Sequence, residues 1–163
     1  MKLIRDGKIA KDEWSYEIES PKLPLKKPTI VDYEVWESTK GELLKQDVQI
    51  GVKLKSDQSP DLISKDLGQI GIVVLEFPLF RDGRPFSYAV LLRSRYNYKK
   101  EIRAVGNVLQ DQFNFLQRCG FSSVKVSEDI DEAIWKKSVS RIKHVYQWSV
   151  DKSVPIKELR KKQ

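Results

Sequence analysis

Cysteine and histidine are almost absent from this chain of 163 residues, which contains one of each, Cys119 and His144. A single cysteine cannot form an internal disulfide, a Cys-x-x-Cys redox pair or the four-thiolate ligand set of an iron–sulfur cluster. A single histidine leaves a zinc or non-haem iron site without its usual imidazole ligands. The sequence therefore predicts no metal site, an inert buried Cys119 and no role for His144.

Long apolar runs and glycine-rich motifs are also missing. No run approaches the roughly 18 apolar residues of a membrane helix, and the first seven residues carry charges where a signal peptide has its apolar region. Neither the Gly-x-Gly-x-x-Gly of a dinucleotide site nor the Gly-Lys-Ser/Thr of a P-loop occurs. We expect a soluble, cytoplasmic protein with no membrane contact and no cofactor, a mononucleotide flavin at loop 77–86 being the one carrier left open.

Basic residues are in excess, and arginine and lysine are distributed differently. The formal net charge is +7 and the pI is about 9.4, which would suit nucleic acid. Six of the nine arginines nevertheless fall between Arg81 and Arg118, whereas lysine dominates both ends. Terminal lysines are typical of a solvated surface, and nucleic acid is the less favoured partner. Residues 150–163 read as a basic, poorly ordered tail.

The hydrophobic pattern alternates between strand and helix. Leu3 to Ala10 reads as a hairpin turning at Asp6-Gly7, and a linker with three prolines reaches residue 28. Expected strands and helices then alternate: strands at 29–31, 48–54, 71–77, 102–105 and 123–126, and helices at 34–45, 60–67, 85–96, 108–118 and 130–141. This predicts one domain, 1–149, made of hairpin and linker 1–28 and an α/β body 29–149, with a mainly parallel sheet that is either open or part of a barrel.

Polar residues gather where strands of such a fold end. Parallel sheets bind ligands at the carboxyl ends of their strands. The loop from Phe77 to Phe86 lies there and carries Arg84, with Ser87 one turn into the next helix. Asn107 follows the next strand, at the expected start of a helix. These three residues are candidate ligands for an anion, because arginine and helix amides suit oxyanions.

Other polar residues fall on faces that should be apolar. A helical projection places Arg93 and Gln112 among apolar residues, and Arg103 lies within a predicted strand. A buried arginine needs a counter-ion. Either nearby carboxylates neutralise these arginines in a structural network, or some of them, together with Gln112, bind an anion such as sulfite, sulfate or phosphate. The weak candidates for an acid or base are the carboxylates Asp82, Glu76 and Asp111.

The stretch from about 51 to 147 resembles the bacterial family catalogued as domain of unknown function 934 (DUF934), often labelled a probable oxidoreductase of sulfite reduction. The chain departs from the family pattern at Asn97, Lys100 and Asn107. The matching residues are Phe77-Pro78, Asp82-Gly83-Arg84, Ser87, Ala89, Leu92-Arg93, Arg95, Glu101, Arg103-Ala104, Gly106, Val108, Asp111-Gln112, Leu116, Arg118-Cys119-Gly120-Phe121 and Tyr146-Gln147.

The resemblance implies a role in assimilatory sulfur metabolism, since genes of this family are commonly found beside those for sulfite reductase. It supplies no mechanism. The resulting hypothesis is an accessory protein that binds an anion, the sulfite reductase or both, through a pocket containing Arg84, Arg93 and Arg103. The alternatives are an enzyme acting on an anionic sulfur compound or phosphate ester, and a basic nucleic-acid-binding protein.

Overall fold

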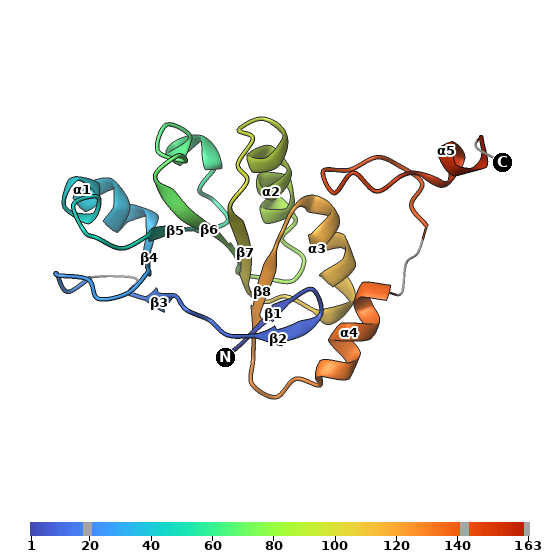
Figure 1. The fold of residues 1–163 in the computed structure, drawn as a ribbon, viewed down its shortest axis with the longest axis horizontal. Coiled ribbons are helices and arrows are strands. Elements are labelled where there is room, and N and C mark those ends of the chain that lie inside the picture. Colours follow the sequence, from blue (N-terminus) through green and yellow to red (C-terminus); the bar gives the residue numbers. More distant parts are fainter. Residues whose placement is uncertain (18–20, 141–143, 162–163) are drawn as a thin grey trace.

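The alternating strands and helices form one curled, mainly parallel sheet that makes half of a barrel (Figure 1). A computed structural model describes residues 1–17, 21–140 and 144–161. The predicted α/β class is confirmed, and of the two forms of sheet left open by the sequence, the partial barrel is the one found.

The elements follow the predicted order. The strands are β1 (Lys2–Arg5), β2 (Lys8–Ala10), β3 (Ser15–Tyr16), β4 (Thr29–Asp32), β5 (Ile50–Leu54), β6 (Ile70–Phe77), β7 (Glu101–Gly106) and β8 (Ser123–Val126). The helices are α1 (Tyr33–Leu43), α2 (Arg84–Ser94), α3 (Phe113–Cys119), α4 (Glu132–Ser140) and α5 (Ile156–Arg160), with 3-10 turns η1 (Pro60–Ile63) and η2 (Gln110–Gln112).

The strand order is β2-β1-β8-β7-β6-β5-β4-β3. All pairs from β3 to β8 are parallel, and β1 pairs antiparallel with both β8 and β2. The β1–β2 hairpin turns at Asp6 and Gly7, whose φ angles of 51° and 74° are the left-handed conformations that such a tight turn requires. The predicted N-terminal hairpin is therefore confirmed.

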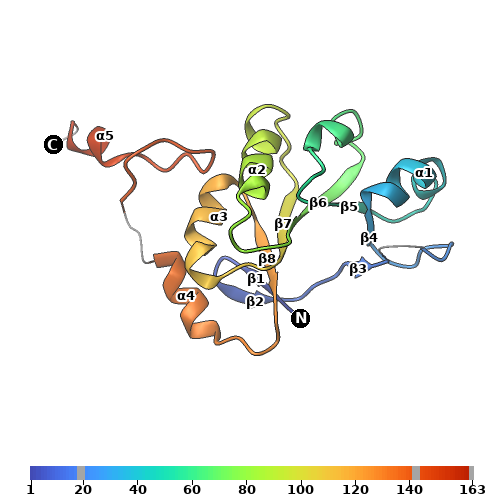
Figure 2. The same ribbon diagram turned by 180° about the vertical axis from the view of Figure 1, so that it is seen from behind.

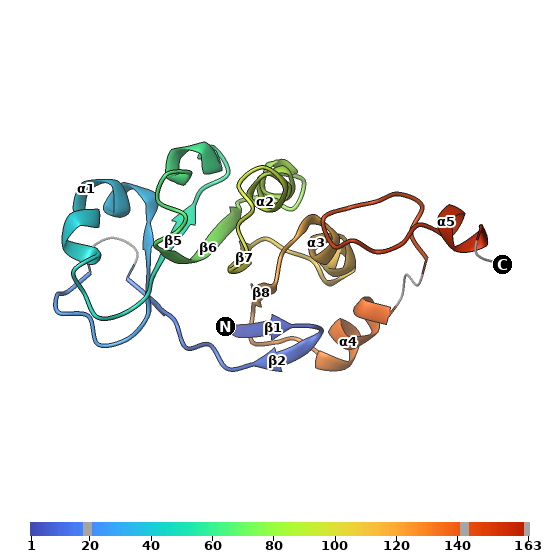
Figure 3. The same ribbon diagram turned by 45° about the horizontal axis from the view of Figure 1, so that its top comes forward.

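The two faces of the sheet are covered differently. Helices α1, α2 and α3 lie on one face, as Figures 2 and 3 show. Side chains such as Val52, Val73 and Ala104 pack there into the main core. Residues 11–16 cross the opposite face between β2 and β3, and Trp14 and Tyr16 cover a smaller apolar cluster there.

Three predicted helices differ from those observed. The segment 60–67 forms only the short η1 turn, and the helix expected at 108 begins at η2 and continues as α3. The last helix of the predicted body, α4, ends at Ser140, and residue 141 of the predicted range lies outside the described residues. In the basic tail, Pro155 bridges to Val145 of the predicted body and residues 156–160 form α5; residues 162–163 are not described. Among the described helices, none has the length and apolarity needed to cross a bilayer.

Candidate docking surface at the strand ends

The carboxyl ends of β6 and β7 are fixed to each other by backbone contacts. Gly106 ends β7 with a φ of 92°, and a side chain there would collide with the Phe77 carbonyl. The same carbonyl accepts a hydrogen bond of 2.8 Å from the backbone N–H of Asn107. Two strand ends therefore meet closely, and only glycine fits at the junction.

Gln112 joins the loops that follow these two strands. Its side-chain oxygen accepts a hydrogen bond of 3.1 Å from the Leu109 N–H, and its side-chain nitrogen donates one of 3.4 Å to the Phe80 carbonyl. Gln112 was predicted as an anion ligand. The structure places its carboxamide between the two loops, where both of its polar atoms are already bonded.

An apolar surface is exposed on these joined loops. Leu79 and Phe80 follow β6, Leu109 precedes η2, and Phe115 lies in the first turn of α3. The exposed fractions of these four residues are 51%, 53%, 44% and 55%. The Phe115 ring packs 4.9 Å from the partly buried Phe86 ring of α2, which anchors it to the core. We call these four residues the strand-end surface. Exposed apolar groups held this firmly are typical of binding surfaces.

Arg84 borders this surface at the start of α2 and is paired within its own loop. Its guanidinium bonds both oxygens of Asp82, at 3.0 and 2.7 Å, and the Ser56 hydroxyl at 3.0 Å. Asp82 also accepts the Arg84 backbone N–H. The carboxylate of Asp82 thus occupies the helix start where a phosphate or other anion was expected to sit.

Arg93 lies at the opposite end of α2 and bonds neutral groups. Its side chain donates to the backbone carbonyls of Gly120, Tyr98 and Lys100 and to the Ser122 hydroxyl, at 2.6–3.0 Å. The helical projection had indicated an inward side chain. Its partners are the ends of neighbouring elements, so Arg93 joins α2 to β7 and β8.

Arg103 is fully buried on the sheet face that residues 11–16 cross. It bonds Glu101 at 3.0 Å, Asp12 at 2.9 Å and the Tyr16 hydroxyl at 2.7 Å. Burial would raise the pKa of Asp12, but the charge and hydrogen bonds of Arg103, with a bond from Lys125, outweigh it and hold that pKa below its ordinary value.

The structure does not bring the three arginines into one pocket. Arg84 and Arg93 are nine residues apart on one helix, which corresponds to about 13 Å, and Arg103 lies on the other face of the sheet. All three have protein partners. The structural network of the alternative reading describes Arg103, which bonds Asp12 and Glu101. Arg93 bonds mainly backbone carbonyls, and Arg84 pairs with Asp82 of its own loop.

The three carboxylates proposed as acid or base lie in separate places. Hydrogen bonds from Arg84 hold the pKa of Asp82 far below its ordinary value, which makes it a poor proton donor. Asp111 is exposed on η2, beside a pocket of about 330 Å³ against α4. Glu76 lies 3.3 Å from Lys53, which is also 3.4 Å from Asp32.

Sequence reasoning missed Asp32 and Lys53. Both lie at strand ends on the face away from the helices, and Asp32 Oδ1 is buried without a hydrogen bond. Burial raises the pKa of Asp32. The sequence feature that could have indicated this group was Lys53 itself, a charged residue within the apolar run of β5. It gave no indication of the partners on β4 and β6.

The remaining candidates have simple surroundings. Ser87 and Asn107 are exposed, and Asn107 precedes the helical segment by three residues, so it is not the helix cap that the sequence suggested. Cys119 is buried, and burial raises the pKa of its thiol to about 11. His144 is exposed. Within the described ranges, no group of three or more His, Cys, Asp or Glu side chains is placed to hold a metal ion.

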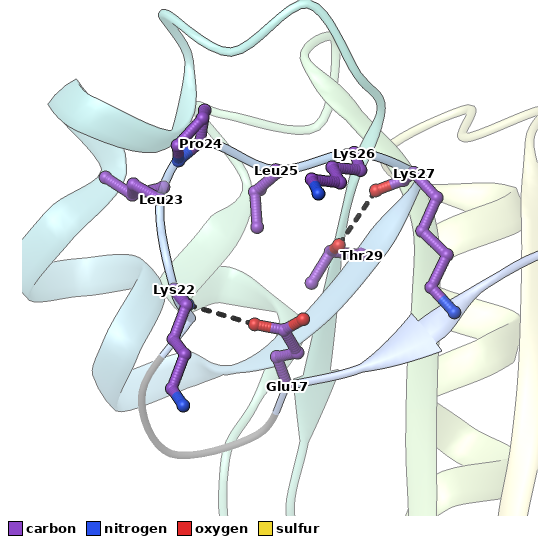
Figure 4. A pocket seen from close by; sticks show the side chains of 8 residues that line it. All are labelled: Glu17, Lys22, Leu23, Pro24, Leu25, Lys26, Lys27 and Thr29. Carbon is purple, nitrogen blue, oxygen red and sulfur yellow. Dashed lines mark hydrogen bonds between the residues drawn. The ribbon is translucent and has the colours of Figure 1, made fainter.

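A larger pocket lies away from all of these residues. It measures about 560 Å³ and is lined by Glu17, residues 22–27 and Thr29 (Figure 4). Glu17 accepts the Lys22 N–H and Thr29 donates to the Lys27 carbonyl, so these two side chains bond the backbone of the segment that lines the pocket. The lining of this pocket contains no predicted site residue.

Fold and surface together define an α/β half-barrel with an exposed apolar surface at two strand ends. The chain belongs to the family described as bacterial protein of unknown function (DUF934), which residues 51–157 match. This confirms the resemblance seen in the sequence. No curated protein and no solved structure matches the chain.

Proposed function

We propose that this protein is an accessory protein of assimilatory sulfite reduction and that it binds the sulfite reductase through the strand-end surface. The link to sulfite reduction comes from the family resemblance. The observation that supports binding is the exposure of Leu79, Phe80, Leu109 and Phe115 on loops that carry residues of the family motif.

Rigidity of the surface favours association. Gly106 and Gln112 hold the two loops in one arrangement, so little conformational freedom remains to be lost on binding. Aromatic side chains at the centre of an interface contribute a large share of its affinity. Phe80 and Phe115 supply two such rings.

Charge defines the kind of partner. Arg81 is exposed next to Phe80, and Arg84 keeps 55% of its side chain exposed despite its bond to Asp82. With a net charge of +7 for the whole chain, these cations favour a partner whose apolar patch has an acidic rim. Such a contact weakens as salt increases, because salt screens exposed charges.

A direct test uses the purified protein and the sulfite reductase of the same cell on a sizing column. We expect co-elution at low salt and separation as salt rises. The double change Leu79→Asp and Phe80→Asp should abolish co-elution. Leu62→Asp is the matched control, because Leu62 on η1 is also exposed, at 49%. The η1 turn lies at the other end of α2 from Arg84, since its residue Asp61 accepts a hydrogen bond from Tyr96, just after that helix.

Four outcomes would contradict this proposal. Absence of co-elution at every salt concentration would exclude the accessory role, and co-elution unaffected by the double change would exclude this surface. Turnover of a sulfur oxyanion or phosphate ester by the protein alone would favour the enzyme instead, with the Asp32–Lys53–Glu76 group as the first place to look. Salt-sensitive binding of RNA or DNA at micromolar affinity or better would favour the nucleic-acid alternative.

A further inference from the structure

A polar pocket lies between α3 and the segment that contains residues 145–159. Its volume is about 320 Å³, and its polar lining comes from Asn114 and Arg118 of α3 and from Asp151 and Ser153 of the C-terminal segment. Figure 3 shows this segment looping beside α3. All residues that line the pocket are within the described part of the chain.

Arg118 attaches the C-terminal segment to α3 and still has an N–H group without a hydrogen-bond partner. One guanidinium nitrogen, Nη2, donates to the Gln147 carbonyl at 2.7 Å, and the Arg118 carbonyl accepts the Ser149 hydroxyl at 2.6 Å. The Nε–H is buried and has no hydrogen-bond partner. An unbonded donor of a charged group is costly, so an acceptor is expected in the adjoining space.

Asp151 does not satisfy this donor. Its nearest oxygen is 3.7 Å from Arg118 Nε, which is too far for a hydrogen bond. Both of its oxygens bond Ser153 instead, one the backbone N–H at 3.2 Å and the other the hydroxyl at 2.7 Å. The carboxylate is therefore engaged in its own turn.

The charge of the C-terminal segment as a whole favours an anion as the missing acceptor, while the charged residues that line the pocket itself are Arg118 and Asp151. Residues 144–161 contain four lysines and arginines against two acidic residues, to which Arg118 adds a further positive charge. A guanidinium binds oxyanions strongly because its N–H groups match their oxygens in geometry and charge. Asn114 places a side-chain amide on the same wall.

From these observations we infer that the pocket between α3 and the C-terminal segment is a binding site for a small oxyanion, with Arg118 as its principal ligand. Sulfate, sulfite, phosphate and carboxylates share the chemistry that this site recognises. An anion bound to Arg118 and to the segment facing it should hold the segment against α3. This site is independent of the strand-end surface, so either proposal can fail without the other.

The test is a calorimetric titration of the full chain with sodium sulfate, sulfite, phosphate and acetate, each against sodium chloride at equal ionic strength. We expect saturable binding of at least one oxyanion and slower proteolysis of residues 144–161 in its presence. Arg118→Gln should weaken binding about tenfold or more. Arg95→Gln is the control, because Arg95 is 68% exposed at the end of α2.

A second variant keeps the inference testable if Arg118→Gln disturbs the fold. Asn114→Asp leaves the bonds of Arg118 intact and adds a negative charge to the wall, so it should also reduce oxyanion binding about tenfold. Binding indistinguishable from chloride would overturn the inference. Wild-type oxyanion affinity in both Arg118→Gln and Asn114→Asp would also overturn the inference. The Leu79→Asp and Phe80→Asp protein should bind the oxyanion normally.

Discussion

Arg103 shows how one charged residue can be placed in the interior of a small protein. Its side chain is 1% exposed, yet Glu101, Asp12, Tyr16 and Ser123 all bond it. Removing the charge would leave Asp12 with Lys125 and Glu101 with Arg5 as their remaining counter-ions, at 3.2 and 2.7 Å. The cost of such a change comes from the lost ion pairs and from the buried hydrogen bonds of Tyr16 and Ser123 that end without a donor.

We therefore predict that Arg103→Met lowers the free energy of unfolding by about 3–5 kcal/mol. Arg84→Ala is the comparison, since Arg84 is 55% exposed and solvent screens its ion pair with Asp82, so this change should leave the free energy of unfolding nearly unchanged. Urea titrations of both variants against the wild type measure the difference. Equal losses would mean that the Arg84 loop is also needed for the fold.

The sequence predicted that Arg93 and Arg103 point inward, because both interrupt apolar faces. It did not predict their partners. Asp12 precedes Arg103 by 91 residues, and only the crossing segment brings it near. Arg118 was visible in the family motif, but its free donor depends on the C-terminal segment, whose position no local pattern indicates.

At the scale of elements, strand and helix alternation was readable because each element buries one periodic face. The two-residue strand β3 was missed, since two residues show no period. The predicted helix at 60–67 shrinks to η1 because Pro60 starts a single turn and Gly68 follows soon after. The curling of the sheet could not be predicted, because it depends on contacts between strands and the sequence of a single strand does not specify them.

The junction of β6 and β7 gives a prediction at this scale. Gly106→Ala should lower the free energy of unfolding by about 1–3 kcal/mol, because alanine is strained at a φ of 92° and its methyl group would meet the Phe77 carbonyl. Gly83→Ala should be neutral or slightly stabilising, since its φ is −84° and no atom lies within 4 Å of the added carbon. Thermal melts distinguish the two, and a melting temperature for Gly106→Ala equal to the wild type would refute the junction's role.

The whole molecule depends on the segment 11–16, which connects the two edges of the half-barrel. Asp12 in this segment binds Arg103 of β7 and Lys125 of β8, while Trp14 and Tyr16 cover the apolar cluster beneath. Lys125 also lies 3.5 Å from the centre of the Tyr16 ring. The segment closes the sheet face opposite α1, α2 and α3, and it is attached both by the ion pairs of Asp12 and by the apolar packing of Trp14 and Tyr16.

This attachment predicts how stability depends on pH. The pKa of Asp12 is lower in the folded protein than its ordinary value of 3.8, so its ion pairs stabilise the fold fully above that value. The contribution is lost as pH falls through the lowered folded pKa. Asp32 acts in the opposite direction, because its raised pKa makes the ionised form less favourable in the folded protein.

Asp12→Asn should therefore destabilise the protein at pH 7, and its stability should approach that of the wild type as pH falls through the lowered folded pKa of Asp12. The reason is that protonation then removes the same charge from Asp12 in the wild type. Urea unfolding at pH 7, 5 and 3 measures the gap, and Asp57→Asn, at an exposed position, serves as the control. A gap between Asp12→Asn and wild type that stays constant with pH would show that the side chain acts through packing, and the electrostatic attachment of the crossing segment would then be wrong.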